Sequence, residues 1–282
     1  MWGGWVVELD IRKYFDTIVH DNLRKMLRKR IRDGEVLCLI DKWLNAGVME
    51  EGRVYYPEAG TPQGGIISPI LANIYLHEVL DMWFEQEVRP RLRGKGFLVR
   101  YADDAVMGFA SKRDAHRVLE VLPKRFAKYG LSLHPEKTRL MPFLRPTAGK
   151  MDRKNGSQSF DFLGFTHYWG KSRKGNWVVK QKTAKDRLTR AIKKISLWCR
   201  RVRHWKVKEQ HKKLVVKMKG HYGYYGITGN KRALACFREE AKRAWKKWLS
   251  RRSQKRKEWE MFDKIQKRYP LPQPRIVHSY VK

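Results

Sequence analysis

The chain has 282 residues, of which 42% are hydrophobic, and a formal net charge of +35. This length allows one large domain or two modest ones with a real core. Small domains usually carry a net charge of about 2–8, so the excess here favours a polyanionic partner over a merely basic surface. The three cysteines are too widely spaced for a metal pair or a disulfide framework, which suits a reducing, cytoplasmic environment. No apolar run approaches the ~20 residues that cross a membrane, and no signal peptide is visible, so no membrane partner is expected.

The positive charge is concentrated in the second half of the chain. Residues 1–150 hold 25 basic and 19 acidic side chains, whereas residues 151–282 hold 38 and 9. An excess of this size is typical of proteins that bind nucleic acid. The division predicts a nearly balanced catalytic half followed by a half that grips nucleic acid.

The first half mixes strand and helix patterns. Apolar side chains alternate along Trp5–Ile11, which predicts a strand. A helix is expected to begin at Asp21, and another over Pro69–Phe84, because apolar residues recur there at helical spacing. Phe97–Tyr101 and Ala105–Phe109 are typical of two short strands joined by a turn, with acidic residues at its tip.

A capped helix should follow the second of these strands. Ser111 can cap it, with Asp114 three residues later in a box-like position and Gly130 marking its end. Pro123 lies inside the pattern and is expected to kink or split the helix. The order strand, helix, helix, hairpin, helix and further strands predicts an α+β fold with an antiparallel sheet rather than a doubly wound one.

The second half begins with a linker and becomes helical. Residues 146–159 are rich in Gly, Pro, Ser, Asn and Lys and are expected to form a loop. Phe160–Tyr168 and Asn176–Val179 predict a short hairpin around Gly170–Gly175. Three amphipathic helices then predict a small bundle, with apolar sides formed by Leu188, Ile192, Ile195, Cys199 and Val202, by Leu214, Val215 and Met218, and by Leu234, Phe237, Ala241, Trp245 and Trp248.

Adjacent carboxylates in the turn between the two short strands are the strongest chemical feature of the chain. Asp103 and Asp104 repel each other there unless a cation satisfies them, although a bare pair is more often only an acidic turn. Asp10 on the first strand adds a further carboxylate and favours a metal site, because oxygen ligands suit Mg²⁺. Two such strands are expected to hold two metal ions, one activating a 3′-hydroxyl and one stabilising the leaving pyrophosphate. Glu8, on the same strand, is interpreted as a neighbouring polar residue rather than a ligand.

Five motifs follow one another over residues 7–165. They are Asp10-Ile11-Arg12-Lys13-Tyr14-Phe15-Asp16; Gly60-Thr61-Pro62-Gln63-Gly64-Gly65 with Ser68-Pro69 and Leu71-Ala72-Asn73; Tyr101-Ala102-Asp103-Asp104; Gly130-Leu131-Ser132-Leu133 with Glu136-Lys137-Thr138; and Phe162-Leu163-Gly164-Phe165. In this order they resemble the palm motifs of reverse transcriptases, in the version found in group II intron enzymes. The resemblance implies a reverse-transcriptase palm followed by an α-helical thumb.

The resemblance also implies roles for individual residues. Asp10 and Asp103 would be the principal ligands of two Mg²⁺ ions, for which Mn²⁺ is a possible substitute, with Asp104 in support and the Ile11 carbonyl joining the shell. Phe15 would be a steric gate against the ribose 2′-hydroxyl, the group that distinguishes RNA from DNA; a core aromatic is the plainer alternative. The remaining nucleotide- and template-binding residues would be Gln63, Gly64, Gly65 and Lys137, although Lys137 is nearly as well explained as a surface lysine.

The segment Lys219–Asn230 resembles the maturase-specific part of group II intron proteins, which also serves as the polymerase thumb. Aromatic rings among glycines and lysines suit RNA, because rings stack on bases and cations meet phosphates. An interhelical turn with packing tyrosines is the alternative. The residues expected to bind RNA are Lys219, His221, Tyr222, Tyr224, Tyr225, Asn230, Arg200, Arg201 and Arg203.

These motifs divide the chain into a palm over 1–145, a linker and hairpin over 146–182, a helical thumb and maturase domain over 183–265, and an extended basic tail over 266–282. No segment resembles the fingers region that precedes the palm in the family, so either the reading frame is truncated or a separate chain supplies the fingers. No Cys or His array resembles the endonuclease domain of some members.

The function that the resemblance implies is RNA-directed DNA synthesis, with an RNA template, a DNA primer and deoxynucleoside triphosphates, together with binding of group II intron RNA for splicing and mobility. One alternative is a splicing cofactor with an incomplete catalytic site. Another is a reverse transcriptase of a different bacterial retroelement or defence system. The sequence leaves the oligomeric state open.

Overall fold

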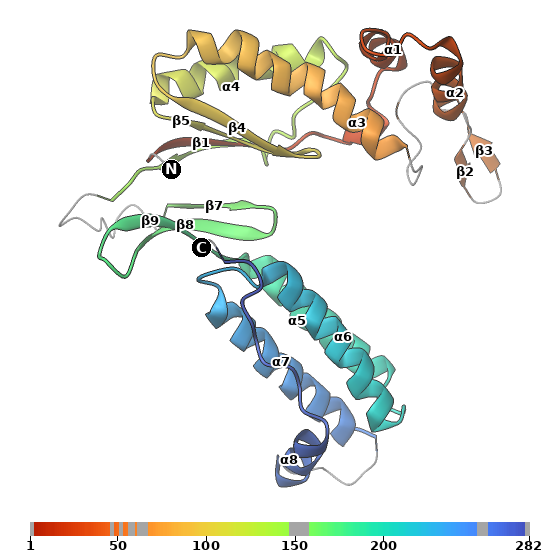
Figure 1. Cartoon of the computed structure of the whole chain (residues 1–282), viewed down its shortest axis with the longest axis vertical. Coiled ribbons are helices and arrows are strands. Elements are labelled where there is room, and N and C mark those ends of the chain that lie inside the picture. The colour runs from red at the N-terminus through yellow and green to blue at the C-terminus, as the bar shows by residue number, and fades with distance from the viewer. Residues whose placement is uncertain are drawn as a thin grey trace. The chain divides into compact units, whose positions relative to one another are not determined.

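The computed structural model describes residues 3–45, 48–50, 53–55, 60, 67–146, 158–252 and 259–279. The chain forms two compact units, Met1–Gln158 and Ser159–Lys282, each with its own hydrophobic core. The predicted α+β class is confirmed, because an antiparallel sheet and helices make up each unit (Figure 1). No described helix is long and apolar enough to cross a membrane.

An antiparallel sheet with strand order β4-β5-β1-β6 forms the base of the first unit. Its strands are β1 (Gly4–Leu9), β4 (Gly96–Tyr101), β5 (Asp104–Phe109) and β6 (Arg139–Phe143). Strand β1 lies between β5 and β6, and its Val7 and Leu9 are buried in the core. Strand β1 begins one residue before the predicted Trp5–Ile11 and ends two residues earlier, because the chain leaves the sheet at Asp10 and Ile11 forms only an isolated bridge, with Leu133.

Helices cover one side of this sheet (Figure 1). They are α4 (Lys112–Ala127) and the helical run that begins with α3 (Ser68–Leu76), whereas α1 (His20–Arg28) packs against α3 and against α2 (Gly34–Leu44). The Ser111 hydroxyl accepts a hydrogen bond from the Asp114 amide, which confirms the predicted cap of α4. Pro123 does not split α4, which continues as one helix to Ala127. Helix α2 was not predicted, although Asp33 caps it by accepting hydrogen bonds from the amides of Glu35 and Val36.

The helical run of α3 is longer than the predicted Pro69–Phe84. It continues through two π turns, His77–Asp81 and Phe84–Val88, and a 3-10 turn, Arg89–Arg91. A π turn widens the helix and leaves carbonyls available to outside donors. Arg125 of α4 supplies such donors: its guanidinium donates to the carbonyls of Val79 and Glu78 at 3.1 and 3.3 Å. A short hairpin of β2 (Val48–Glu50) and β3 (Arg53–Tyr55) completes the described part of this unit.

The second unit begins with a three-stranded antiparallel sheet, β7 (Ser159–Phe162), β8 (Phe165–Lys171) and β9 (Trp177–Thr183). The predicted hairpin around Gly170–Gly175 is present, with a longer second strand than expected, but the predicted first strand Phe160–Tyr168 is wrong, because a turn at Leu163 and Gly164 divides it between β7 and β8. Helices α5 (Lys185–Arg201), α6 (Val207–Tyr225) and α7 (Lys231–Ser250) follow at the three predicted positions. Their shared core contains Trp245, whose indole nitrogen donates to the buried Gln210 side chain at 2.9 Å.

The end of the chain differs from the predicted basic tail. Helix α8 (Trp259–Arg268) includes the first residues assigned to that tail, and its Phe262 is buried in the helical core. The extended residues that follow are docked, because the amides of Val277 and His278 donate to the Gly226 carbonyl at the end of α6. Residues 269–279 therefore belong to the folded second unit.

Candidate active site

The turn between β4 and β5 carries two of the three aspartates that the sequence singles out. Tyr101 and Asp104 are the last pair of the two strands, so Ala102 and Asp103 form the turn itself. Ala102 has a φ of 54°, a conformation that favours glycine and costs another residue about 1–3 kcal/mol. Asp103 is partly buried and Asp104 is exposed. The turn is therefore a strained feature that its surroundings must hold in place.

Asp10 reaches the same edge of the sheet from the neighbouring strand. Leu9 of β1 pairs with Ala105 of β5, so Asp10 follows and Asp104 precedes the same rung of the sheet. The Asp10 carbonyl accepts a hydrogen bond of 2.8 Å from the His134 amide, which anchors the backbone as it leaves the strand. The structure thus brings Asp10 to the Asp103–Asp104 turn, as the motifs predict.

Lys137 lies beside Asp10. Its ammonium group is 3.1 Å from Asp10 Oδ2, with the two side chains 61% and 36% exposed. The sequence places Lys137 near an incoming triphosphate; the structure places it against the carboxylate that would hold a metal ion. Glu8, by contrast, accepts a hydrogen bond of 2.6 Å from Arg139, which agrees with its interpretation as a polar neighbour.

Phe15 sits in a tight turn directly after Asp10. Lys13 has a left-handed conformation at the start of the 3-10 turn Tyr14–Asp16, and Tyr14 is buried, with its hydroxyl donating to the Ala72 carbonyl. Burial raises the pKa of Tyr14, so its hydroxyl remains protonated. Phe15 is half-buried, with its ring centroid 5.5 Å from that of Tyr14. Part of the Phe15 side chain is therefore accessible at the aspartate-bearing edge.

Gly60, the first residue of the motif that contains Gln63, packs against this turn. It has a φ of +93°, and a Cβ at this position would lie 2.9 Å from the Phe15 carbonyl oxygen. Glycine is required here both by its conformation and by the close backbone approach. Gln63, Gly64 and Gly65 themselves lie outside the described residues.

One residue at the site was not predicted. Arg100, immediately before the Tyr-Ala-Asp-Asp motif, donates a 2.8 Å hydrogen bond to the Ala102 carbonyl within the aspartate-bearing turn. A charged residue on a short strand next to two carboxylates is the sequence feature that would have drawn attention to it.

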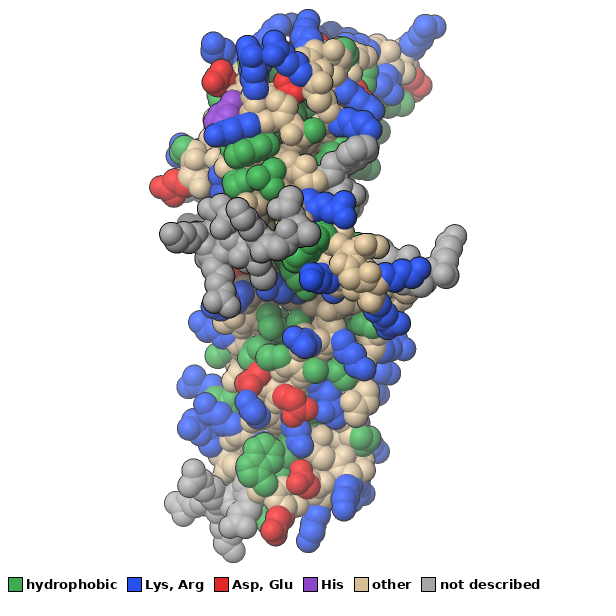
Figure 2. All heavy atoms as spheres, turned by 90° about the vertical axis from the view of Figure 1, so that its left-hand side faces the viewer, with side chains coloured by type: hydrophobic (Ala, Val, Ile, Leu, Met, Phe, Trp, Pro, Cys, Tyr) green, Lys and Arg blue, Asp and Glu red, His purple; other side chains and the backbone are tan. Residues whose placement is uncertain are grey.

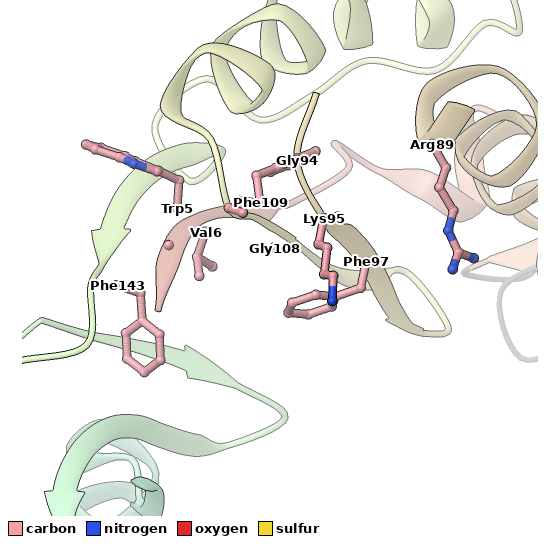
Figure 3. Close-up of a pocket in the computed structure, with 12 residues that line it drawn as sticks. Trp5, Val6, Arg89, Gly94, Lys95, Phe97, Gly108, Phe109 and Phe143 are labelled. Carbon is pink, nitrogen blue, oxygen red and sulfur yellow. The ribbon is translucent and has the colours of Figure 1, made fainter. Parts of the chain in front are cut away.

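A pocket of about 560 Å³ lies elsewhere in the first unit, at the end of the sheet where β1 begins (Figure 3). Val6, Phe97 and Phe143 project from the same side of the sheet there, and Arg89 and Lys95 stand at its border. Its lining contains no carboxylate, and Asp10 lies beyond the opposite end of β1. The pocket is therefore separate from the aspartate-bearing edge.

In the second unit, two of the residues expected to bind RNA instead support the fold. Tyr222 and Asn230 are each 1% exposed. Tyr222 donates its hydroxyl proton to the Pro272 carbonyl. Asn230 accepts from the Thr183 amide at 2.9 Å and donates to the Thr183 hydroxyl and the Tyr225 carbonyl at 2.8 Å. The expectation of RNA contact through these two side chains is wrong, because the chain itself satisfies and covers them.

Replacing Asn230 with alanine is expected to lower the free energy of unfolding by about 2–4 kcal/mol, because it leaves buried groups of Thr183 and Tyr225 without partners. Urea denaturation measures this change. Asn176→Ala, at an exposed turn of the same unit, is the matched control and should shift stability by no more than about 0.5 kcal/mol. An equal effect of the two substitutions would contradict the structural role of Asn230.

His221 is held between aromatic rings rather than presented to a ligand. Its ring centroid is 3.8 Å from that of Phe237 and 4.7 Å from that of Tyr225, and its Nε2 is buried with no hydrogen-bond partner among the described residues. Burial lowers the pKa of His221 to about 4. The imidazole is therefore neutral at pH 7 and is a poor phosphate-binding cation.

The low pKa of His221 predicts that the second unit loses stability in mild acid. The unfolded chain takes up this proton as the pH falls through about 6.5, whereas the folded chain resists until about pH 4, so stability falls across that window. The loss should reach about 2–3 kcal/mol by pH 4. Urea denaturation at pH 7.5 and pH 5 measures it, and His221→Phe, which cannot titrate, should reduce the dependence and leave the part due to His167, whose pKa is also lowered by burial. Parallel losses in both proteins would refute this assignment.

The other residues expected to bind RNA are accessible to different degrees. Tyr224 is 54% exposed and donates its hydroxyl proton to the Leu163 carbonyl, whereas Tyr225 is only partly exposed. Lys219, Arg200 and Arg201 are exposed, and Arg203 is partly so. Lys and Arg side chains are spread over the face of the molecule in Figure 2, with few acidic side chains among them. These cations remain available to a polyanion.

Comparison with known proteins assigns this arrangement to a family. The family model for reverse transcriptase (RNA-dependent DNA polymerase) matches residues 3–167, more than half of the chain, including all five palm motifs but not the segment Lys219–Asn230. The chain belongs to the reverse transcriptase family. The match confirms the resemblance inferred from the motifs and includes both aspartate-bearing strands.

Named relatives narrow the type of reverse transcriptase. The chain is 36% identical over 155 residues to the group II intron-encoded protein LtrA of Lactococcus lactis subsp. cremoris, covering 52% of this chain and 24% of that protein. It is 52% identical over 96 residues to a 91 kDa protein in cob intron of Schizosaccharomyces pombe, covering 34% of this chain and 12% of that protein. These similarities place this reverse transcriptase among the group II intron enzymes. The chain covers less than a third of the length of either relative.

Among solved structures, apo telomerase from Candida tropicalis is similar in fold. The similarity has a TM-score of 0.53 at 12% sequence identity and covers 90% of this chain and 43% of that one. At this sequence identity the similarity supports only the fold of this chain and carries no conclusion about its activity.

Proposed function

We propose that this chain forms the palm and thumb of an RNA-directed DNA polymerase, which extends a DNA primer on an RNA template with deoxynucleoside triphosphates. The observation that supports this most is the edge of the palm sheet, where Asp10 directly follows β1, Asp103 lies in the turn before β5 and Asp104 is the first residue of β5. A primer 3′-hydroxyl attacks the α-phosphate of the nucleotide there, and pyrophosphate leaves.

The oxygen donors at this edge fit divalent metal ions. Asp10 already attracts a cation, because the Lys137 ammonium lies 3.1 Å from its carboxylate. The described residues include no cluster of three or more His, Cys, Asp or Glu side chains suited to a metal ion. Mg²⁺ does not require such a cluster, because it usually takes one or two carboxylates and completes its shell with water and substrate phosphates.

The proposed ligands of two Mg²⁺ ions are Asp10 and Asp103, with Asp104 and the Ile11 carbonyl in support. Mn²⁺ also suits oxygen ligands and would substitute. When bound, the two ions activate the 3′-hydroxyl and stabilise the leaving pyrophosphate. Lys137 is then free to turn from Asp10 to the triphosphate, where it adds positive charge and a proton for the leaving group. Gln63, Gly64 and Gly65 are proposed to contact the nucleotide and template.

The second unit is proposed to bind the intron RNA and the primer–template duplex. Its helices carry the charge excess of residues 151–282, and exposed arginines such as Arg200 and Arg201 end α5. Cations of this kind bind phosphates whatever the base sequence, so affinity depends steeply on salt. This binding would serve splicing and mobility of the intron, and the reducing conditions that suit the unpaired cysteines are those of the cytoplasm.

Primer extension on an RNA template with the purified chain tests the proposal. Mg²⁺-dependent incorporation of deoxynucleotides supports it, and a steep fall of RNA affinity between 50 and 200 mM salt supports the role of the second unit. Tight intron-RNA binding without extension would instead favour the splicing-cofactor alternative for this chain. A flat salt response would contradict the proposed binding of RNA by the basic second unit.

A further inference from the structure

Arg100 joins three separate segments of the first unit. Its guanidinium binds Asp81 in a bidentate manner, with Nε 2.7 Å from Oδ1 and Nη2 2.6 Å from Oδ2. Its remaining nitrogen, Nη1, donates to Asn73 Oδ1 at 2.9 Å and to the Ala102 carbonyl at 2.8 Å. One side chain on β4 therefore ties α3 and the following π turn to the turn that carries Asp103.

The partners of Arg100 are themselves held in place. Asp81 ends the π turn His77–Asp81, and π turns are frequent at functional sites because they redirect the side chains that follow. Arg125 braces this turn through the carbonyls of Val79 and Glu78. Asp81 is 26% exposed and Arg100 only 12%, so the pair is shielded from solvent more than a surface ion pair. The network is thus a rigid support rather than a chance surface contact.

The turn needs such a support for two reasons. Ala102 adopts a positive φ without being glycine, so its conformation persists only where neighbouring groups hold it. Asp103 and Asp104 are also adjacent carboxylates, whose mutual repulsion favours opening of the turn. The hydrogen bond from Arg100 to the Ala102 carbonyl opposes both effects from within the protein.

The charge of Arg100 is balanced at the same time. A free guanidinium so close to the turn would attract Asp103 and compete with a metal ion for its carboxylate. The bidentate bond to Asp81 uses two of its donor groups and neutralises its charge. The donors of Nη1 face an amide oxygen and a carbonyl oxygen, which are neutral acceptors.

We propose that Arg100, neutralised by Asp81 and anchored to Asn73, is a positioning residue that holds the Ala102–Asp103 turn in the geometry that binds metal. This inference rests on the proposed polymerase function for its kinetic consequences. Its structural core, a turn held by one guanidinium, does not depend on that function.

Hydrogen exchange and primer extension together test the proposal in the full chain, with the variants Arg100→Ala, Arg100→Lys and Asp81→Asn. Arg24→Ala is the matched control, because Arg24 forms a comparable ion pair with Asp41 at 2.7 Å in the same unit but does not touch the turn. Peptides over residues 97–109 should exchange faster in Arg100→Ala than in the wild type. They should be unchanged in Arg24→Ala.

The kinetic readout separates positioning from general stability. Arg100→Ala should lose about 100-fold in kcat, the scale expected of a small misplacement of a reacting group, with the KM for nucleotide little changed. Asp81→Asn, which leaves the guanidinium unbalanced, should raise the Mg²⁺ concentration for half-maximal extension. Arg100→Lys should restore only part of the rate, because an ammonium cannot reproduce the planar fork. Added methylguanidine should partly rescue Arg100→Ala.

Two results would overturn the inference. One is exchange over residues 97–109 that is the same in Arg100→Ala, Arg24→Ala and the wild type. The other is an Arg100→Ala enzyme whose kcat and Mg²⁺ requirement match those of Arg24→Ala. A wild-type chain that extends no primer would count against the proposed function, and hydrogen exchange would still decide whether Arg100 holds the turn.

Discussion

Replacing Asp103 with alanine is expected to reduce primer extension by at least about 10³-fold while leaving RNA affinity within a few-fold of the wild type. Asp103 lies in the strained turn before β5, at the same edge of the sheet as Asp10, where its carboxylate is proposed to hold the ions that stabilise charge in the transition state. Such stabilisation contributes several kcal/mol, and each 1.36 kcal/mol corresponds to a factor of about ten in rate. RNA is proposed to bind mainly through the second unit, so its affinity should persist. Single-turnover extension and filter binding measure the two quantities.

Asp263→Ala supplies the control for Asp103→Ala. It removes one exposed carboxylate from α8, so it changes the net charge equally without touching the palm. We expect it to leave extension unchanged. Equal losses of extension and RNA affinity in Asp103→Ala, or equal rates in the two variants, would argue against a metal-binding role for Asp103.

The period of the apolar residues correctly predicted the strands and helices that have a regular apolar side. The strand from Trp5, the hairpin around Asp103 and the three helices after residue 183 were found where apolar residues repeat at a single period. Helix α2 was not predicted, although Asp33 at its start is a favourable cap. The predicted ends of elements were wrong where contacts with distant parts of the chain determine them. The run after α3 continues through π turns because Arg125, more than thirty residues away in sequence, satisfies their carbonyls.

The candidate site was predictable to the extent that it lies in short motifs. Asp10, Asp103 and Asp104 lie at one edge of the sheet because β1 pairs with β5 in an antiparallel manner. Each of these aspartates also lies in a short motif that can be recognised in the sequence. Arg100 was missed because its role depends on partners at Asn73 and Asp81, which lie 27 and 19 residues away. No local pattern encodes such a bond.

The maturase-like segment shows the opposite error. The resemblance to the maturase segment, together with its composition, suggested that His221, Tyr222 and Asn230 contact RNA, since aromatic and polar residues among glycines suit that role. In the structure this segment ends α6 and forms the turn to α7, so Tyr222 is buried in the helical core and Asn230 is bonded to Thr183 and Tyr225. Tyr224 and Lys219 lie on the exposed side. The register of α6, which composition does not show, separates the exposed Lys219 and Tyr224 from the buried Tyr222, and the fold of the turn to α7 buries Asn230.

Phe15→Val is expected to lower discrimination against ribonucleotides by roughly 10- to 100-fold, the range that a steric difference of a few carbon atoms supplies. Phe15 follows Asp10 by five residues and is half-buried, with its backbone fixed by the close approach of Gly60. Because the backbone is held there, it cannot move into the space that the ring leaves. Shortening the side chain therefore opens room for a 2′-hydroxyl.

The discriminating measurement is the ratio of kcat/KM for a deoxynucleotide to that for the matching ribonucleotide, in wild type and in Phe15→Val. Its control is Tyr14→Phe, which removes only the hydroxyl that bonds the Ala72 carbonyl in the core. That variant should lose stability without changing the ratio. If Phe15→Val lowers both rates equally and leaves the ratio unchanged, Phe15 acts as a packing residue, the plainer of its two interpretations. If the ratio falls with the deoxynucleotide rate preserved, the ring excludes the ribose hydroxyl, and the edge that bears Asp10 is where the incoming sugar lies.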